Sequence, residues 1–201
     1  MIPLLLATRN AHKTAEFTKI LGGEFAVTDL SSRSELPEVE ESGETFGENA
    51  LLKALAVSGV VSTLVVADDS GLEVDALEGR PGVYSARYAG EGATDERNVA
   101  KLLEELRGVA PSLRTGRFRC ALALAREGKT LATFLGSVEG VIADWPRGKN
   151  GFGYDPVFVP VAFEQTFAEL GEAVKNTISH RANTIRQLRR WLTDPSEKKT
   201  P

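Results

Sequence analysis

Cysteine is almost absent from this sequence of 201 residues: Cys120 is the only one, so no disulfide can form within the chain. It lies in the apolar run 118–122, which is typical of an inert buried thiol rather than of a nucleophile. Histidine is nearly as scarce, with two residues, and this excludes a histidine-rich zinc site. The sequence also lacks the Ser-His-Asp order of a serine hydrolase.

Long hydrophobic runs are missing as well. No segment reaches the length of a membrane span, and Met1 leads into a short apolar run without the basic region of a signal peptide. We therefore expect a soluble, cytoplasmic protein. The net charge of −4 argues against a nucleic-acid polymer as the main partner. Local basic groups with a metal ion could still bind a small anion.

The hydrophobic pattern predicts the fold class. With 42% hydrophobic and 26% charged residues, the chain has ample material for a globular core. Strands are predicted at residues 2–7, 25–28, 64–67, 118–125 and 131–142, and helices at 10–21, 45–57, 94–106, 166–178 and 179–192. Because these elements alternate around a hairpin turn at 126–129, we expect an α/β domain with a mixed sheet. It should cover residues 1–193, with a loose tail at 194–201.

Residues 64–75 carry the most informative pattern. An apolar run leads into two adjacent carboxylates, Asp68 and Asp69, after which Ser70-Gly71 is predicted to turn the chain. The acids would then lie at the rim of the sheet, where α/β proteins bind ligands. Mg²⁺ suits such a pair, because it prefers oxygen ligands and is often shared with phosphates. A plain polar turn is the alternative. We favour a functional site, because two acids directly after a buried strand cost free energy unless a cation compensates their charge.

Two N-terminal segments could also contact a ligand. Residues 8–13 lie where a strand gives way to a helix, whose N–H groups and Lys13 would attract phosphate. A simple N-cap by Asn10 is the plainer interpretation, and spacing alone favours it. Glu40 and Glu41 form an acidic pair that could serve a metal or could simply be a solvated loop.

Two C-terminal segments offer donors and aromatic rings. The loop 146–156 has three glycines, two cations and two aromatic residues, which suits the wrapping of a ring, although a flexible connection would look the same. Lys175, His180 and Arg181 provide several donors for phosphate or for a carbonyl-rich base. Alternatively, Ser179 caps the last helix and its neighbours are surface groups.

Taken in order, these segments resemble the inosine triphosphate pyrophosphatase family, the house-cleaning dITP/XTP pyrophosphatases. The match is collinear over residues 6–181, and its most specific parts are ADDSGLEVDAL (67–77), PGVYSARYAG (81–90), GKNGFGYDPVF (148–158) and KNTISHRANT (175–184). The resemblance implies an elongated mixed β-sheet flanked by helices, two lobes around a central nucleotide cleft, and commonly a homodimer. It also implies Mg²⁺-dependent hydrolysis of non-standard purine nucleoside triphosphates (ITP, dITP, XTP) to the monophosphate and pyrophosphate, which removes deaminated purines from the nucleotide pool.

By position, the resemblance assigns roles to individual residues. Asp69 would be the general base and would hold the metal together with Glu41 or Glu40, with Asp68 in support. The triphosphate would be held by Thr8, Arg9, Asn10, Ala11, His12 and Lys13, and Ser70 would touch the substrate. The purine would be surrounded by Phe152, Gly153, Tyr154, Asp155, Lys175, His180 and Arg181. Arg9 stands where the family usually has glycine. Arginine lacks glycine's backbone freedom, so it changes that turn or adds a cation near the triphosphate.

Two other functions are open to this sequence. One is a pyrophosphatase for modified pyrimidine or methylated nucleotides, and the other is a non-catalytic nucleotide-binding module. The donor-rich segment 175–181 favours a purine with a carbonyl at position 6. The number of acids argues against a pure binder, because a protein that only binds polyanions gains little from them.

Overall fold

The structure is a computed structural model that describes residues 1–36 and 38–194, so the predicted tail lies outside the described residues except for Asp194. The strands are β1 (Ile2–Leu6), β2 (Phe25–Asp29), β3 (Leu64–Val74), β4 (Thr115–Arg126), β5 (Lys129–Ile142) and β6 (Phe158–Pro160). The helices are α1 (Ala11–Leu21), α2 (Phe46–Ser58), α3 (Asp95–Glu105), α4 (Phe167–Leu170), α5 (Glu172–Ile178) and α6 (His180–Thr193). Short 3₁₀ helices are η1 (Asp75–Leu77), η2 (Gly82–Arg87) and η3 (Pro111–Leu113).

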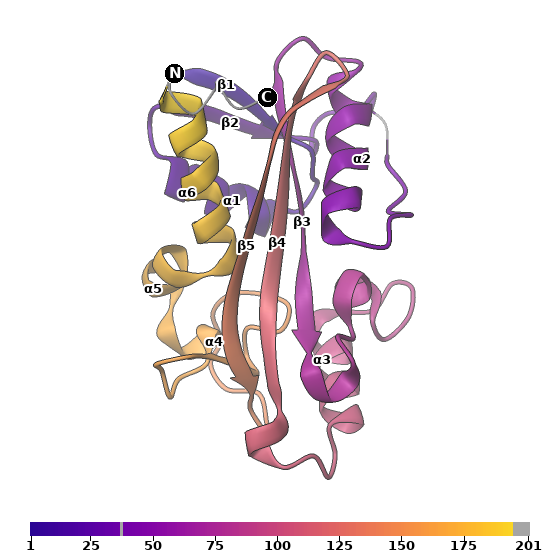
Figure 1. Cartoon of the computed structure of the whole chain (residues 1–201), viewed down its shortest axis with the longest axis vertical. Coiled ribbons are helices and arrows are strands. Elements are labelled where there is room, and N and C mark those ends of the chain that lie inside the picture. The colour runs from indigo at the N-terminus through magenta and orange to yellow at the C-terminus, as the bar shows by residue number, and fades with distance from the viewer. Residues whose placement is uncertain (37, 195–201) are drawn as a thin grey trace. The chain divides into compact units, whose positions relative to one another are not determined.

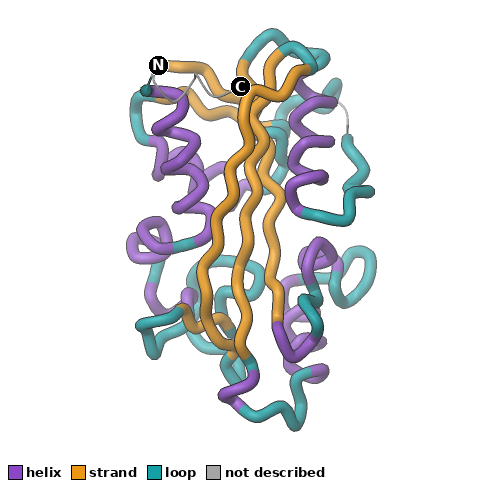
Figure 2. The backbone as a smooth tube through the Cα atoms, in the orientation of Figure 1, coloured by secondary structure: helices purple, strands orange, loops and turns teal. Residues whose placement is uncertain are grey.

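The strands form one six-stranded sheet in the order β2-β1-β3-β4-β5-β6, drawn in orange in Figure 2. β1 pairs in parallel with both β2 and β3, whereas β5 and β6 are antiparallel. Glu127 and Gly128 join β4 to β5 with φ of 52° and 70°, the backbone conformation of a tight hairpin turn. The predicted α/β class with a mixed sheet is therefore confirmed.

The chain divides into two compact units, and each has its own hydrophobic core. Unit 1 comprises Met1–Asp69, Cys120–Gly136 and the chain from Arg181 on, and unit 2 comprises Ser70–Arg119 and Ser137–His180. The core of unit 1 includes Leu6, Phe17, Leu122, Ile185 and Leu188. The core of unit 2 includes Leu72, Leu102, Phe118, Tyr154 and Phe158.

Local capping signals start the helices where the sequence predicts. The Asn10 side chain accepts the N–H groups of His12 and Lys13 at 2.9 and 3.2 Å, and α1 follows. Thr45 and Glu48 form a capping box at the start of α2, which the sequence predicted as a helix over 45–57. Within unit 1, α1 and α6 lie on one side of the strands and α2 lies on the other (Figure 1). Helices therefore face β3 from both sides.

The strand with the paired acids differs from the prediction. β3 runs unbroken from Leu64 to Val74, so Ser70-Gly71 does not turn the chain and the acids lie inside the strand. β1 pairs with β3 only as far as Val66, which places Asp68 and Asp69 just beyond the end of β1. The predicted turn was wrong because cations on both faces of β3 make two acids tolerable within a strand.

Two smaller differences concern the C-terminal half. The helix predicted over 166–178 is split into α4 and α5, because Gly171 adopts a φ of 77° that ends α4. β6 was not predicted, since three residues are too few to show a pattern. β6 lies at the edge of the sheet, where proline is tolerated, and its last residue is Pro160.

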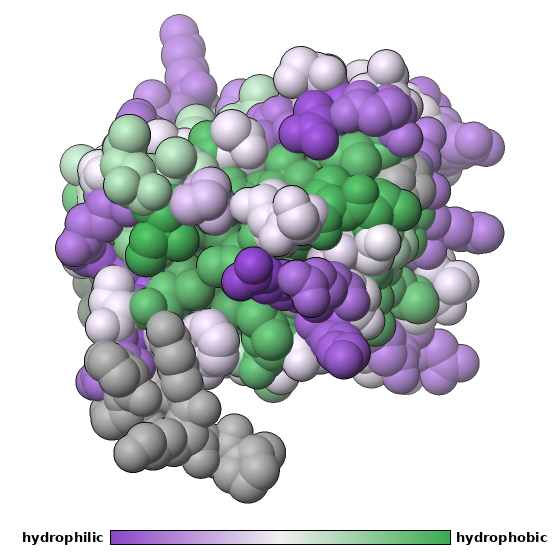
Figure 3. Space-filling view, turned by 90° about the horizontal axis from the view of Figure 1, so that it is seen from above, coloured by the Kyte–Doolittle hydropathy of each residue, from purple (hydrophilic) through white to green (hydrophobic). Residues whose placement is uncertain are grey.

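Apolar side chains also reach the surface. In Figure 3, green apolar areas lie between purple polar side chains at the end of unit 1 that holds the β4–β5 turn. Exposed large apolar residues of unit 1 include Met1, Val60, Leu131 and Leu135. Among the described residues, no helix combines the length and the apolar character needed to cross a bilayer.

Candidate active site

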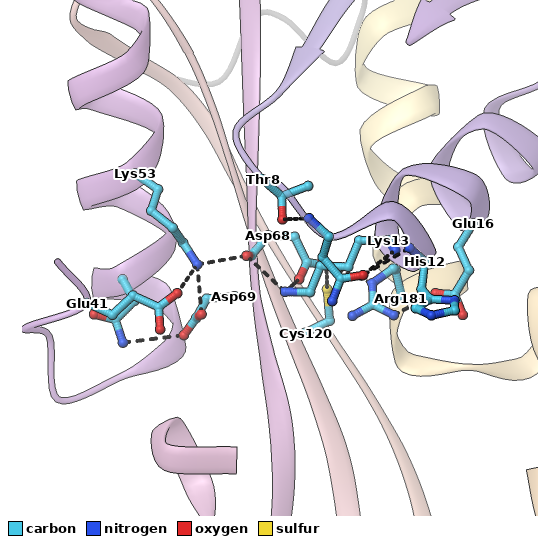
Figure 4. Close-up of polar contacts among 12 residues, drawn as sticks. Thr8, His12, Lys13, Glu16, Glu41, Lys53, Asp68, Asp69, Cys120 and Arg181 are labelled. Atoms are coloured by element: carbon cyan, nitrogen blue, oxygen red, sulfur yellow. Dashed lines mark hydrogen bonds and ion pairs between the residues drawn. The ribbon is translucent and has the colours of Figure 1, made fainter. Parts of the chain in front are cut away.

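Asp68 and Asp69 point to opposite faces of β3, because successive side chains of a strand alternate. Oδ1 of Asp68 lies 2.5 Å from Nζ of Lys13, which belongs to α1. Oδ1 of Asp69 lies 2.8 Å from Nζ of Lys53, which belongs to α2. Figure 4 shows the two clusters on either side of the strand, all within unit 1. The paired acids therefore have separate partners.

The cluster around Asp69 contains a second carboxylate. Nζ of Lys53 lies 2.7 Å from Oε1 of Glu41, so one ammonium holds both acids. Asn49, one helical turn before Lys53, donates its amide to Oδ2 of Asp69 at 3.4 Å and accepts the N–H of Gly43 at 2.8 Å. α2 thus sets the positions of both the strand acid and the loop that carries Glu41.

Electrostatics in this cluster favours different charge states for the two acids. Burial, together with the charge of Glu41, raises the pKa of Asp69 to about 6 in spite of Lys53. Burial also disfavours the ionised Glu41, but Lys53 outweighs it and lowers the pKa of that carboxyl. Asp69 is therefore the group in this cluster that can take up a proton near neutral pH.

The carboxylate of Asp68 is fully buried. Oδ2 of Asp68 accepts a hydrogen bond from Nε of Arg181 at 2.8 Å and another from the thiol of Cys120 at 3.3 Å. Arg181 also pairs with Glu16 of α1 at 2.6 Å. Burial opposes the ionised Asp68, but Arg181 and Lys13 outweigh it and hold its pKa well below the usual value. Burial raises the pKa of the Cys120 thiol well above its usual value, which agrees with the predicted inert thiol.

The two clusters meet at one backbone atom. The main-chain oxygen of Asp68 accepts hydrogen bonds from Nζ of Lys53 at 2.9 Å and from Nζ of Lys13 at 3.4 Å. Both ammonium groups are therefore close together, and their side chains keep 12% and 15% of their surface exposed. Two adjacent, partly exposed cations beside carboxylates suit the oxygens of a phosphate chain with its metal.

The segment 8–13 lies beside Lys13 at the start of α1. Asn10 caps the helix, as in the plainer interpretation, and its own N–H is accepted by Oγ1 of Thr8 at 3.2 Å. Ala11 and His12 are exposed in the first turn. Arg9 donates to the main-chain oxygen of Leu36 at 3.4 Å, and its φ is not positive. This turn therefore accepts arginine without strain.

The acids of unit 1 fit a magnesium ion. Mg²⁺ is usually held by one or two carboxylates together with waters and substrate phosphates. Glu41 and Asp69 supply two carboxylates, which both contact Nζ of Lys53, whereas Glu40 is exposed. No cluster of three or more acidic, histidine or cysteine ligands occurs among the described residues. Phosphate and water oxygens would therefore have to complete the coordination.

Unit 2 holds a second buried cluster, formed by three residues predicted to surround the purine. Nζ of Lys175 lies 2.6 Å from Oδ2 of Asp155, and both side chains are almost completely buried. The same Asp155 oxygen accepts the N–H of Phe152 at 3.0 Å. Lys175 also lies over the ring of Phe152, 4.4 Å from its centroid. A ring, a cation and an acid thus form one fixed group.

Contacts elsewhere in unit 2 hold this loop in place. Gly153 donates its N–H to Asp95 of α3 at 2.6 Å, and the Tyr154 hydroxyl donates to the main-chain oxygen of Ser85 at 2.9 Å. Burial raises the pKa of Tyr154, so its hydroxyl stays protonated as a donor. His180 stacks on Phe118 with ring centroids 4.8 Å apart. Ser70 is the first residue of unit 2, within β3.

Sequence reasoning missed Lys53, Asn49 and Glu16. Lys53 interrupts the apolar run of the predicted helix 45–57, four residues after Asn49 and on the same helical face. Glu16 follows Lys13 by three residues on α1 and is buried. A charged residue within an apolar stretch, one turn from another polar residue, is the signal that could have found them.

Comparisons with known proteins identify the family of this chain. The model of the Ham1 family matches residues 4–191. A Listeria monocytogenes protein named dITP/XTP pyrophosphatase is 50% identical over 100% of this chain and 99% of its own length. A Bacillus subtilis protein of the same name is 49% identical over 94% of this chain and 96% of its own length. The solved structure of the Staphylococcus aureus Ham1 protein has 42% identity and a TM-score of 0.84, covering 94% of this chain and 97% of its own. This chain belongs to the Ham1 family, as its motifs predicted.

Proposed function

We propose that this protein hydrolyses non-standard purine nucleoside triphosphates, with dITP, ITP and XTP as substrates, to the monophosphate and pyrophosphate. The observation that carries the proposal is the convergence of Lys13 and Lys53 on the main-chain oxygen of Asp68, beside the carboxylate of Asp69. Relatives about half identical to this chain, and matching nearly all of it, bear the name dITP/XTP pyrophosphatase. That name supports the same reaction here.

The reaction assigns each group of the Asp69 cluster a role. Water beside Asp69 attacks the α-phosphorus, and a new phosphorus–oxygen bond forms. The bond from the α-phosphorus to the bridging oxygen breaks, and pyrophosphate leaves. The water's proton passes to Asp69, whose pKa of about 6 suits a base working near neutral pH. Lys13 and Lys53 offset the charge that gathers on the phosphate oxygens.

We include Mg²⁺ in this proposal. Glu41 and Asp69 would hold the ion, which when bound supplies positive charge to the phosphate oxygens. Thr8, Asn10 and the first N–H groups of α1 belong to the same end of the phosphate site, with Arg9 as an additional exposed cation. Asp68 would act through its partner Lys13.

The Lys175 cluster would select the base. Hypoxanthine and xanthine carry a carbonyl at position 6, where adenine carries an amino group. A donor such as Lys175 would donate a hydrogen bond to the carbonyl oxygen, whereas the amino group of adenine would face it as a second donor without a partner. An unmatched buried donor costs about 1–3 kcal/mol, which is enough for useful discrimination. The ring of Phe152 under Lys175 offers a face for the purine.

We also propose that the protein acts as a homodimer in the cytoplasm. A single buried cysteine suits a reducing compartment. Exposed large apolar side chains such as Trp145 and Val161 offer surface for a second copy. Light scattering on the purified protein tests the oligomeric state; a mass of one chain across micromolar concentrations would rule the dimer out.

A substrate panel tests the proposed function. Purified protein is given ITP, dITP, XTP, ATP, GTP, dUTP and a methylated nucleotide, with Mg²⁺ or with chelator, and pyrophosphate and phosphate are measured separately. We expect Mg²⁺-dependent release of pyrophosphate from the first three at least tenfold more efficiently than from ATP, roughly the gain from one matched donor. GTP carries the same carbonyl at position 6, so its turnover tests instead whether the pocket rejects the amino group at position 2. Faster turnover of dUTP or the methylated nucleotide would favour the other pyrophosphatase. Binding without turnover would favour a sensing module.

A further inference from the structure

The loop that carries the proposed purine contacts is attached to α3 at one exposed carboxylate. Oδ2 of Asp95, the first residue of α3, accepts a hydrogen bond from the N–H of Gly153 at 2.6 Å. Gly153 lies in the chain between Phe152 and Asp155, the two loop residues that contact Lys175. A contact at Gly153 therefore bears on both of the groups that surround the buried ammonium.

A second contact joins the same loop to the motif 81–90, to which the proposed reaction assigns no role. The hydroxyl of Tyr154 donates a hydrogen bond to the main-chain oxygen of Ser85 at 2.9 Å. Ser85 is buried, and its own hydroxyl donates to the main-chain oxygen of Gly82 at 2.6 Å and accepts the N–H of Leu72, in β3, at 2.9 Å. Two adjacent residues of the loop thus have separate anchors within unit 2.

α3 is itself fixed to the motif 81–90, so Asp95 has a defined position. Asn98, one helical turn after Asp95, is buried. Its amide accepts the N–H of Ala89 at 2.8 Å and donates to the main-chain oxygen of Ala86 at 3.1 Å. Buried amides in proteins are nearly always satisfied in this way. The helix is thereby held on its buried face, and its exposed first turn offers the carboxylate to the loop.

We infer that Asp95 is a positioning residue for the choice of base, because it keeps the loop 152–155 in place around Lys175. This inference rests on the proposed function, in which Lys175 donates to a carbonyl at position 6 of the purine. A hydrogen bond to a carboxylate is stronger than one between neutral groups. Glycine also has the greatest backbone freedom, so a contact at the N–H of Gly153 restrains the loop where it is otherwise least restrained.

The inference separates the base from the phosphates. Asp95 and the loop that it holds belong to unit 2, whereas Lys13 and Lys53 of the proposed phosphate site belong to unit 1. Loss of the Asp95 contact should therefore change the preference between purines without changing the affinity for a polyphosphate that has no base.

The preference for ITP over ATP in Asp95 variants tests this role. The ratio of kcat/KM for the two nucleotides is the readout, because both carry the same triphosphate and a general change of charge cancels in the ratio. We expect Asp95→Ala to lower the ratio roughly two- to tenfold, the worth of one hydrogen bond. Asp95→Asn keeps an acceptor oxygen at the same place and should retain most of the ratio.

Three controls accompany these variants. Glu96→Gln removes an exposed charge at the next position of α3 and should leave the ratio unchanged. Binding of inorganic pyrophosphate with Mg²⁺, measured by calorimetry, should be the same in the wild type and in the Asp95 variants. In a Lys175→Met background, Asp95→Ala should change the ratio less than about 1.5-fold, because both changes act through one ammonium. Thermal melting by circular dichroism checks that each variant folds.

Several results would overturn the inference. A wild-type ratio in Asp95→Ala would show that the contact with Gly153 does not affect the choice of base. An equal loss in Glu96→Gln would assign the effect to charge, and weaker pyrophosphate binding in Asp95→Ala would assign it to the phosphates. Full additivity with Lys175→Met would mean that Asp95 does not act through Lys175. If the wild type itself fails to prefer ITP over ATP, the proposed choice of base fails, and the positioning role fails with it.

Discussion

Nζ of Lys53 lies between two carboxylates, 2.8 Å from Oδ1 of Asp69 and 2.7 Å from Oε1 of Glu41. Two acids brought this close would repel each other without a cation between them. Lys53 therefore allows β3 to carry Asp69 in its interior and allows the 41–43 loop to fold against it. The same ammonium donates to the backbone of Asp68, which ties the cluster to the strand.

Replacing Lys53 with methionine should disable the proposed reaction. The Lys53→Met variant keeps the bulk of the side chain but removes the charge, so Asp69 and Glu41 repel and the phosphate chain loses a cation. We expect kcat for pyrophosphate release from ITP to fall by about 10²–10⁴. Lys19→Met, an exposed change on α1, serves as the control. Near-normal turnover of Lys53→Met would remove Lys53 from the site.

The raised pKa of Asp69 gives the pH dependence of unfolding a definite sign. An unfolded aspartate releases its proton near pH 4, but the folded Asp69 keeps it up to about 6. Its contribution to stability is therefore complete below pH 4 and is lost as pH rises through about 6. Relative to Asp69→Asn, the wild type should lose on the order of 2 kcal/mol of unfolding free energy between pH 4 and 8.

Urea denaturation of both proteins at pH 4 and pH 8, in chelator-treated buffer, measures this difference. Chelation matters because a bound cation would favour the ionised carboxylate and mask the effect. The comparison with the variant cancels the titration of groups that do not interact with Asp69. A difference in unfolding free energy that stays constant between the two pH values would show that Asp69 titrates normally in the folded chain.

Adjacent glutamates provide a matched test of the metal site. Glu41 shares Lys53 with Asp69, whereas Glu40 is exposed. We expect Glu41→Gln to raise the Mg²⁺ concentration needed for half-maximal activity about tenfold or more, because one of two carboxylate ligands is lost. Glu40→Gln should leave the Mg²⁺ titration unchanged. The opposite ranking of the two variants would assign the metal to Glu40 instead.

The sequence predicted those parts of the fold that depend on neighbouring residues. Asn10, Thr45 with Glu48, and Thr94 all cap the helices expected from them, because a cap is decided within four residues. The turn at Glu127-Gly128 is local in the same sense. Elements with strong local signals were therefore predicted correctly.

What the sequence did not predict depends on distant partners. β3 continues through Asp68 because Arg181, 113 residues further along the chain, neutralises it. No short-range pattern reports such a contact. Likewise, the motifs grouped Arg181 with Lys175 because they are close in sequence, but Arg181 belongs to unit 1 and Lys175 to unit 2. Which of the two units a side chain belongs to therefore needed the structure.

The buried Lys175 should govern the choice of base. Lys175→Met keeps the side chain's length but removes the donor that we propose for the carbonyl at position 6. We expect the ratio of kcat/KM for ITP over ATP to fall by roughly 10- to 100-fold, the worth of one charge-assisted contact. Lys149→Met changes an exposed lysine of the neighbouring loop and should preserve the ratio. Equal loss for both nucleotides would indicate a purely structural role for Lys175.

Two glycines of the loop 146–156 can distinguish the effect of backbone strain from that of a steric clash with Asp155. Gly151 and Gly153 have positive φ angles of 78° and 61°, which cost a side chain about 1 kcal/mol. A Cβ at Gly151 would also collide with the carboxylate of Asp155, whereas one at Gly153 meets open space. Gly151→Ala should therefore displace Asp155 from Lys175 and reduce the ITP-to-ATP ratio about tenfold or more. Gly153→Ala should lower only the melting temperature, by a few degrees. Thermal unfolding and the ITP and ATP kinetics are measured for both variants. Equal losses of selectivity in the two variants would show that backbone strain, not the Asp155 contact, controls the pocket.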